Sequence, residues 1–255
     1  PTYEKIMISY LDLCMELNRS REAKDGLHQY RNLSQSQAPG SLEVVIRHLI
    51  DKAERACLEA KAAADAKVEA GTAPSPADAT ATEESAVLEV DDLDTGASAG
   101  SSLLLTTVSS DPLRTRTDHG ILLPRLRFLW ESYRAVLDIL RSNSKLERLY
   151  HGTARGALEF CARYRRRTEF RRLCDMLRMH LGNLQKYGGG GEPVGADGKP
   201  NSKVRGWEGW TTESIELHLQ TRFVQLETAS SLHLYTEGFR TVEDIYNILQ
   251  ISHGA

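Results

Sequence analysis

Apolar residues recur at steps of three and four positions through three consecutive segments between residues 122 and 187. This spacing limits the fold more than any other feature of the chain. The first segment carries it at Leu122, Leu126, Leu129, Tyr133, Val136, Leu137 and Leu140. The third segment carries it at Phe170, Leu173, Cys174, Leu177, Leu181 and Leu184. Steps of three and four line one face of a helix with 3.6 residues per turn. Each stripe needs another helix against it, so the pattern predicts packed helices.

The helical period continues through most of the chain and predicts an all-α fold. In the first helix the predicted stripe is Ile6, Tyr10, Leu13, Cys14 and Leu17. We expect eight helices, at about 3–19, 20–35, 41–69, 122–142, 144–164, 168–187, 211–232 and 236–251. Neighbours joined by very short connections should be antiparallel. The expectation is no β-sheet and at least six helices longer than ten residues.

Helix starts are predicted from capping residues. Ser20 and Ser41 are the expected N-caps of the second and third helices. Ser144 and Glu147 match the S-x-x-E capping box, and Thr211 or Thr212 starts the helix after the second loop.

Self-comparison of the sequence indicates a repeat. A shift of 147 places Leu13, Leu17, Ala23, Gly26, Leu27 and Tyr30 on Phe160, Tyr164, Phe170, Leu173, Cys174 and Leu177. A shift of 216 places Ala23, Gly26 and Tyr30 on Phe239, Val242 and Tyr246. Each unit is a helix, a tight polar turn and a second helix. The pattern favours a right-handed tetratricopeptide-like solenoid, although no unit carries the full tetratricopeptide signature.

Two interruptions divide this helical pattern. Residues 70–118 are rich in Ala, Ser, Thr, Gly and acids, and residues 188–209 are rich in Gly and polar residues. Such compositions bury too little apolar surface to offset ordering entropy, so we expect two disordered insertions. The predicted organisation is N-terminal helical repeats at 1–69, an acidic flexible insertion at 70–118, and central helical repeats at 119–255 with the Gly-rich loop at 188–209. Limited proteolysis should cut in both insertions first.

Charge is unevenly distributed although the net charge is only −3. Eleven basic and four acidic residues lie between Lys145 and Lys186. The candidate contacts to RNA or the ribosome are Arg163, Arg165, Arg166, Arg167, Arg171, Arg172 and Arg178. Contact with phosphates and a solvated face paired with nearby acids are about equally supported by the sequence. Replacing Arg166, Arg167 and Arg171 with Glu is expected to change stability little.

Catalytic and metal-binding motifs are not found. The four cysteines are widely spaced and are read as reduced core thiols of an intracellular protein. The eight histidines show no paired-ligand spacing, so we expect no metal site, and no P-loop or G-x-S-x-G motif indicates an enzyme or a cofactor. Trp130 and Tyr133 are expected in the core. For Trp207 and Trp210, packing back on the helices is favoured over a role as a peptide-like anchor.

Several long strings carry a family resemblance. They are Tyr10 to Leu17 (YLDLCMEL), Leu27 to Arg31 (LHQYR), Phe128 to Arg134 (FLWESYR), Asn143 to His151 (NSKLERLYH), Glu169 to Leu181 (EFRRLCDMLRMHL), His218 to Leu226 (HLQTRFVQL) and Val242 to Ile245 (VEDI). In these strings and their order the chain resembles the N-terminal region of the largest (a) subunits of eukaryotic translation initiation factor 3. That region is part of a PCI domain and begins with tetratricopeptide-like helices.

The resemblance implies a non-catalytic scaffold that supports assembly of the factor and recruitment of mRNA and the small ribosomal subunit. It implies a cytoplasmic location, no membrane contact, and partners among other subunits of the factor (the c subunit especially), ribosomal proteins and rRNA. A protein-only scaffold of another PCI complex, such as the proteasome lid, is the alternative. Pro1 stands where an initiator Met is absent, so we expect the true start to lie upstream. No signal peptide is expected.

Overall fold

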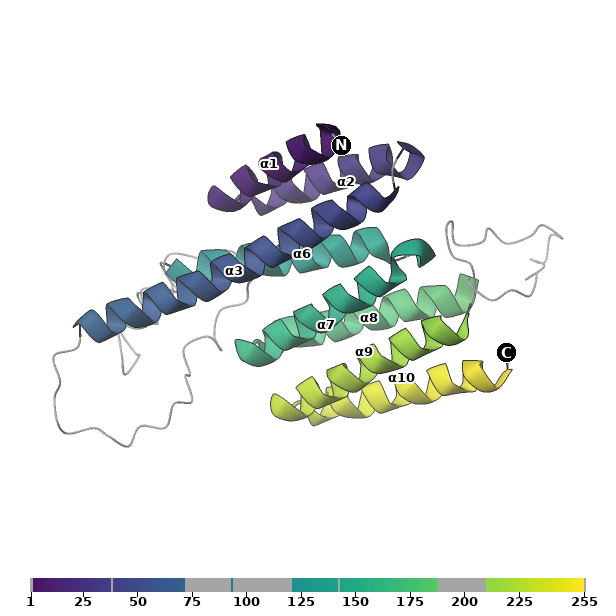
Figure 1. The fold of residues 1–255 in the computed structure, drawn as a ribbon. Coiled ribbons are helices and arrows are strands. Elements are labelled where there is room, and N and C mark those ends of the chain that lie inside the picture. The colour runs from purple at the N-terminus through teal and green to yellow at the C-terminus, as the bar shows by residue number, and fades with distance from the viewer. Residues whose placement is uncertain are drawn as a thin grey trace, which may run out of the picture. The chain divides into compact units, whose positions relative to one another are not determined.

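The computed structural model describes residues 2–37, 39–71, 93, 121–141, 143–187 and 210–254, and these residues form helices joined by turns (Figure 1). The helices are α1 (Thr2–Glu16), α2 (Ser20–Gln37), α3 (Pro39–Gly71), α6 (Leu123–Leu140), α7 (Glu147–Arg163), α8 (Arg167–Tyr187), α9 (Thr212–Ser231) and α10 (Tyr235–Gly254). A short 3₁₀ helix, η3 (Ser144–Leu146), precedes α7. The shortest of the α helices, α1, has 15 residues, and no strand occurs in the described ranges. The all-α prediction is confirmed for them.

The chain divides into two compact units, Pro1–Ala135 and Val136–Ala255. In the first unit, α1, α2 and α3 contact one another. The Ser41 hydroxyl of α3 donates to Glu4 of α1 at 2.6 Å and lies 2.5 Å from the Tyr30 hydroxyl of α2. The prediction that Ser41 is an N-cap is therefore wrong. The helix begins at Pro39, a residue suited to the first helical turn, and Ser41 instead connects three helices.

The first part of α6 belongs to the same unit and supplies its largest aromatic core residues. Trp130 and Tyr133 are fully buried, as predicted, and the Tyr133 hydroxyl donates to Glu54 of α3. Arg125 of α6 donates from Nη1 to the Met15 carbonyl at the end of α1, at 2.6 Å. These contacts fix α3 and α6 within the unit.

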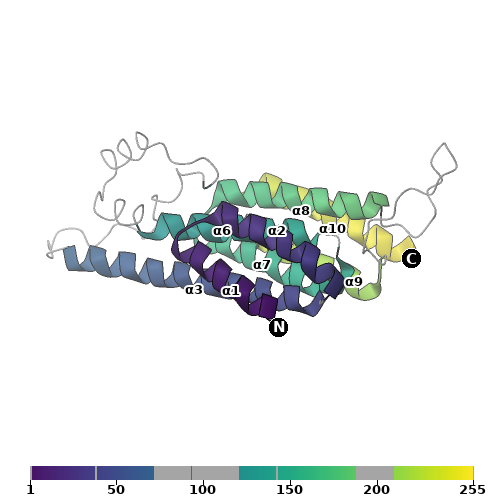
Figure 2. The ribbon, with the colours of Figure 1, turned by 90° about the horizontal axis from the view of Figure 1, so that it is seen from above.

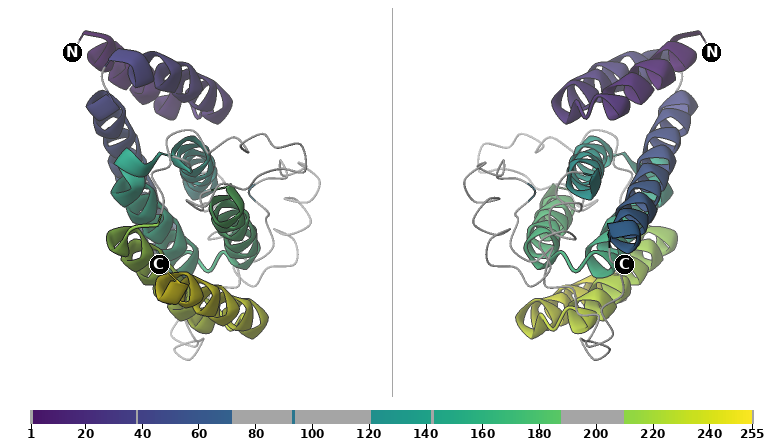
Figure 3. Two further views of the ribbon diagram at one scale, coloured as in Figure 1. Left: turned by 90° about the vertical axis from the view of Figure 1, so that its right-hand side faces the viewer. Right: turned by 90° about the vertical axis from the view of Figure 1, so that its left-hand side faces the viewer.

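The second unit contains the end of α6 and helices α7 to α10. α7 contacts both α8 and α9, and α10 contacts α9 and α8. Figure 2 shows the unit from above, and α9 and α10 run side by side in both views of Figure 3. Thr211 caps α9 as predicted, because its side chain accepts a hydrogen bond from the Ser214 amide at 3.1 Å.

One turn geometry recurs at three helix–helix connections, α1–α2, α7–α8 and α9–α10. Asn18, Arg165 and His233 all have positive φ, at 53°, 53° and 57°. In each turn the next amide closes back on a carbonyl five residues earlier, as in a Schellman motif; these bonds are Arg19 N to Cys14 O, Arg166 N to Cys161 O and Leu234 N to Ala229 O, at 2.7, 2.8 and 2.8 Å. The repeat at a shift of 147 is thereby confirmed. The second shift is 215 and not 216, so that prediction is wrong by one residue.

The apolar face predicted for the first helix is also wrong. Of the predicted α1 stripe only Cys14 is buried, while Met7, Leu11 and Met15 fill the contact with α2 and α3. The exposed stripe of α1 is Tyr3, Ile6, Tyr10, Leu13 and Leu17. In α10 the exposed stripe is Tyr235, Phe239, Val242, Tyr246 and Leu249. In α1 two apolar faces follow helical spacing, and the sequence period fits either one.

α10 buries a face that is largely polar. Glu237, Thr241 and Asp244 are buried together with Ile245 and Ile248. Their partners come from the neighbouring helices: Gln225 Nε2 donates to Thr241 Oγ1 at 2.8 Å, and Arg178 Nε lies 3.4 Å from Asp244 Oδ1. Because these polar groups are paired inside, the aromatic and aliphatic side of α10 is left on the surface.

The two insertions predicted to be disordered, 70–118 and 188–209, lie outside the described residues apart from the end of α3 and Leu93, and so does Trp207. Trp210 is described. It packs with Leu219 against Leu181, Ile215 and Ile248, as predicted. All four cysteines are free and buried, in agreement with the prediction of reduced core thiols. Among the described residues, no helix combines the length and the apolar content that a membrane crossing requires.

Candidate functional site: the arginine surface and a buried histidine pair

The run of arginines lies where α7 ends and α8 begins. Arg163 is the last residue of α7 and Arg167 the first of α8, and Arg165 occupies the left-handed position of the turn between them. Four arginines of this region have exposed side chains, Arg163, Arg165, Arg167 and Arg171. We name these four the arginine surface. A cation in the last turn of α7 is also favoured by the helix dipole, which accounts for the place of Arg163.

Arg166 does not belong to this surface. Its side chain is 1% exposed and forms a bidentate pair with Glu169, Nε to Oε2 at 3.0 Å and Nη2 to Oε1 at 2.7 Å. Glu169 is equally buried. The prediction that Arg166 faces a partner is wrong because the turn directs residue 166 inward, where Glu169 lies one helical turn later. The expected tolerance of Arg166→Glu is wrong for the same reason, since it would bury two carboxylates together.

Arg178 and Arg172 also differ from the outward orientation that the run suggests. Arg178 pairs with Asp175 at 3.3 Å on its own helix and with Asp244 of α10 at 3.4 Å. It thereby belongs to the polar contact between α8 and α10, so its assignment as an outward contact is wrong. Arg172 is half-buried. The sequence period could not reveal the orientation of Arg178, because its partner Asp244 lies 66 residues further along the chain.

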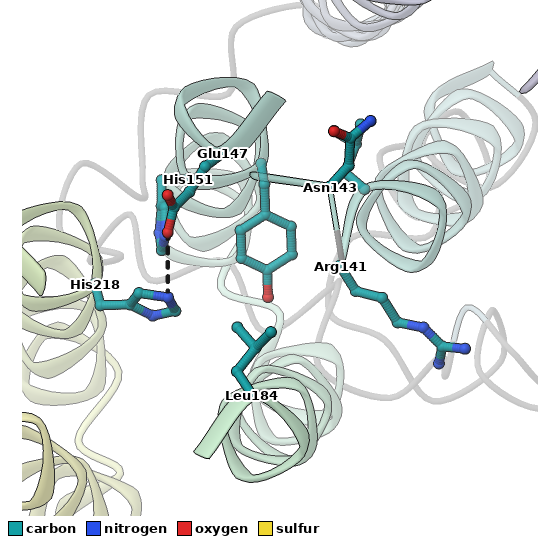
Figure 4. Close-up of a pocket in the computed structure, with 8 residues that line it drawn as sticks. Arg141, Asn143, Glu147, His151, Leu184 and His218 are labelled. Atoms are coloured by element: carbon teal, nitrogen blue, oxygen red, sulfur yellow. Dashed lines mark ion pairs between the residues drawn. The ribbon is translucent and has the colours of Figure 1, made fainter. Parts of the chain in front are cut away.

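A second constellation lies between α7 and α9 (Figure 4). Glu147 and His151 stand one turn apart on the same face of α7, and His218 projects from α9 toward them. Glu147 Oε1 lies 3.7 Å from His218 Nε2 and 3.9 Å from His151 Nε2. The two imidazole rings meet edge to face, with centroids 4.3 Å apart. These are the types of side chain that bind a transition metal.

The surroundings of this constellation are mainly buried. Burial lowers the pKa of His218 to about 3 and that of His151 well below its usual value, with nearby charges adding to the effect at His151. Burial also raises the pKa of Glu147, which accepts a hydrogen bond from the Ser214 hydroxyl at 2.5 Å. A small cavity lined in part by Leu140, Asn143 and Tyr150 opens beside the three side chains.

The spacing of residues along the sequence does not reveal this cluster. Glu147 is predicted as the second member of a capping box, but its carboxylate turns to Ser214, and Asn143 instead accepts the Lys145 amide at the start of η3. The one local signal is the four-residue step from Glu147 to His151. His218 lies 67 residues beyond His151, and only the packing of α9 on α7 brings the two together.

Antiparallel helix pairs joined by one recurring turn, with apolar and basic faces left exposed, define a tetratricopeptide-like helical-repeat protein. A family model described as "eIF3a, PCI domain, TPR-like region" matches residues 1–255. The chain belongs to this family, the tetratricopeptide-like PCI region of the A subunit of eukaryotic translation initiation factor 3.

Curated relatives agree with this membership. The chain is 43% identical to the A subunit of eukaryotic translation initiation factor 3 from Arabidopsis thaliana over 246 residues, 96% of this chain. It is 40% identical to the protein of that name in Mycosarcoma maydis over 252 residues and 38% identical to that of Coccidioides immitis over 249. The chain spans 22% of the length of each of these relatives. The names of these relatives favour the translation factor over the alternative prediction, a scaffold of another PCI complex such as the proteasome lid.

Proposed function

We propose that this chain is a non-catalytic scaffold region of translation initiation factor 3, acting in the cytoplasm. Its principal role is to hold other subunits of the factor, the c subunit in particular, through apolar helix faces. A second role is to contact the small ribosomal subunit through the arginine surface, which assists recruitment of the ribosome and mRNA.

The observation that carries the scaffold role is the pair of exposed apolar stripes on α1 and α10. Tyr235 and Phe239 are each 70% exposed, and Ile6 is 60% exposed. In each helix the stripe residues follow one another at steps of three and four, as in helices that pack in a groove or a bundle. Single exposed apolar residues need no explanation, but five aligned along one helix are typical of an interaction surface.

The test is binding of the purified c subunit to charged stripe variants. One variant combines Ile6→Glu with Leu13→Glu on α1, and another combines Phe239→Glu with Tyr246→Glu on α10. Matched controls place Glu at exposed polar positions of the same helices, Ser9→Glu and Asn247→Glu. We expect at least one stripe variant to bind about tenfold more weakly or worse, because central apolar anchors dominate interface energies. Unchanged binding of both, at unchanged circular dichroism, would refute this role.

The ribosome contact rests on the clustering of the arginine surface. Arg163, Arg165, Arg167 and Arg171 surround one turn and are exposed, and guanidinium groups bind phosphates in a bidentate manner. Arg166 and Arg178 are left out of this surface because they pair with acids of the chain itself.

The second test measures binding to purified small ribosomal subunits across a salt series. The variant carries Arg163→Glu, Arg167→Glu and Arg171→Glu, and the control carries Arg21→Glu, Arg47→Glu and Arg55→Glu, the same charge change at exposed positions of α2 and α3. We expect the variant alone to bind more weakly, with a salt slope smaller by about one for each replaced arginine that touches a phosphate in the native complex. Equal behaviour of the variant and the control would favour a protein-only scaffold.

A further inference from the structure

The buried cluster of Glu147, His151 and His218 has no part in the scaffold role, and its three side chains are of types that bind metal ions. The three ligand atoms lie within 4.8 Å of one another, and they come from two helices that contact along their length. His151 is 1% exposed and His218 is 5% exposed. A helix–helix contact of this kind is usually filled by apolar side chains, so three ionisable groups facing one another require a physical reason.

The hydrogen bonds of His151 fix which of its nitrogens is free. The Thr221 hydroxyl donates its proton to the Leu217 carbonyl at 3.0 Å and lies 2.8 Å from His151 Nδ1. Since a hydroxyl carries one proton, Nδ1 must donate to Thr221, and Nε2 then carries a lone pair. That nitrogen is buried and has no hydrogen-bond partner among the described residues, and the same holds for Nε2 of His218.

The third ligand atom is also an acceptor. The Glu147 carboxylate takes its hydrogen bond from Ser214 and presents Oε1 to both imidazoles at distances beyond hydrogen bonding. The lone pair of His151 Nε2 therefore faces the Glu147 carboxylate in a largely buried space, and His218 Nε2, which also has no hydrogen-bond partner among the described residues, lies beside both. Leaving a buried acceptor unsatisfied costs about 1–3 kcal/mol.

We propose that Glu147, His151 and His218 form a binding site for a divalent transition metal, with Zn²⁺ the best match. Two imidazole nitrogens and one carboxylate are a common zinc ligand set, and a metal attracts all three electron pairs at once. Bonds of about 2.0–2.2 Å in tetrahedral geometry set ligand atoms about 3.4 Å apart. The observed 3.7 and 3.9 Å come close to that spacing, so small side-chain movements complete the site.

The surroundings supply the supporting shell that zinc sites require. Thr221 orients His151 through Nδ1, Ser214 orients Glu147, and the Trp210 ring lies against His218 with centroids 5.3 Å apart. The adjoining cavity leaves the fourth coordination position open to a small ligand such as water. The bound metal joins the start of α7 to α9 and stabilises the second unit, a role distinct from partner binding.

The experiment titrates the purified 255-residue chain, first stripped with a chelator, with Zn²⁺ in a calorimeter and follows its melting temperature. We expect one metal per chain and a higher melting temperature with zinc, because a ligand that binds only the folded state stabilises it. Glu147→Gln and His218→Gln should abolish both effects. His180→Gln is the matched control, since His180 is a buried histidine of the same unit outside the cluster. Metal binding that survives Glu147→Gln and His218→Gln unchanged, or no binding below millimolar zinc, overturns the proposal.

Two further measurements keep the proposal testable if a ligand variant fails to fold. Thr221→Val keeps the ligands and removes only the hydrogen bond to His151, and we expect it to weaken binding by about 10–100-fold. Co²⁺ in place of zinc should give visible bands of tetrahedral nitrogen and oxygen ligation. An intense near-ultraviolet band from thiolate ligation would place the metal on cysteine and overturn the assignment, as would unchanged affinity in Thr221→Val.

Discussion

The buried ion pair between Arg166 and Glu169 permits a sharp test of how the turn between α7 and α8 is stabilised. Replacement of Arg166 by Met keeps a side chain of similar length and removes the charge, so little cavity forms. At the 2.7 Å separation of Nη2 and Oε1, and with an effective dielectric constant of about 20, the attraction of two unit charges is about 6 kcal/mol. Much of that attraction offsets the desolvation of the two groups, but Arg166→Met leaves Glu169 buried without its partner. We expect a loss of about 3–5 kcal/mol in the free energy of unfolding.

The chain contains its own control for this substitution. Arg19 and Glu22 occupy the equivalent positions of the α1–α2 turn, 147 residues earlier, and form the same i,i+3 pair at 3.3 Å. Their side chains are 65% and 47% exposed, so Arg19→Met should cost less than about 1 kcal/mol. The double variant Arg166→Met with Glu169→Leu should recover most of the lost stability, since apolar replacement of a whole buried pair is often neutral.

Urea denaturation followed by circular dichroism measures all of these variants. With a denaturant slope of about 2 kcal/mol per molar, Arg166→Met should lower the midpoint for the second unit by about 2 M, whereas Arg19→Met should hardly move the midpoint for the first. If Arg166→Met lowers the free energy of unfolding no more than Arg19→Met does, then burial does not make the Arg166–Glu169 pair important for stability, and this explanation of the turn is refuted. A double variant no better than Arg166→Met would show that shape, and not charge, dominates.

Three further predictions follow from burial and backbone position. Burial, with the charge of Arg141 next in effect, lowers the pKa of His180 to about 4, so the unfolded state binds the proton of this residue first as pH falls. The contribution of His180 to stability should be complete above pH 6.5 and decline by about 1.4 kcal/mol per pH unit between 6.5 and 4. The decline in stability measured by thermal melts should therefore be shallower in His180→Gln. An alanine Cβ at position 182 of α8 would meet nothing within 4 Å, so Gly182→Ala should raise the free energy of unfolding by about 0.5–1 kcal/mol. A Cβ at position 26 would lie 2.6 Å from the Tyr10 ring, so Gly26→Ala should not raise the free energy of unfolding of the first unit. Burial raises the pKa of Cys57 to about 12, and it also raises the pKa of the other three thiols. Ellman's reagent at pH 8 should therefore find no reactive thiol in the native chain and four in denaturant. Rapid reaction of any cysteine in the native state would contradict its burial.

The sequence by itself determined the helices and the family. Apolar steps of three and four, polar turns and a capping threonine at 211 are local signals, and the observed α helices begin and end within a few residues of the predicted positions. The turn equivalence of Asn18 and Arg165 was also accessible, because the 147-residue shift aligns two turns of the same chemistry. The strings that carry the family resemblance are read from the sequence alone, and the comparisons confirm them.

The tertiary structure decided which helix face is buried and which polar groups meet. α1 has two apolar stripes one position apart, and contact with α2 and α3 selects the one through Met7 and Leu11 over the one through Ile6 and Leu13. The period of a helix gives its phase only when a single face is apolar, so the sequence could not make this choice. Arg166 and Arg163 look alike in a run of arginines, yet one lies beside Glu169 inside the fold and the other on the surface. Glu147, His151 and His218 converge only because α9 packs on α7, and such contacts between distant segments depend on three-dimensional packing that no local spacing records.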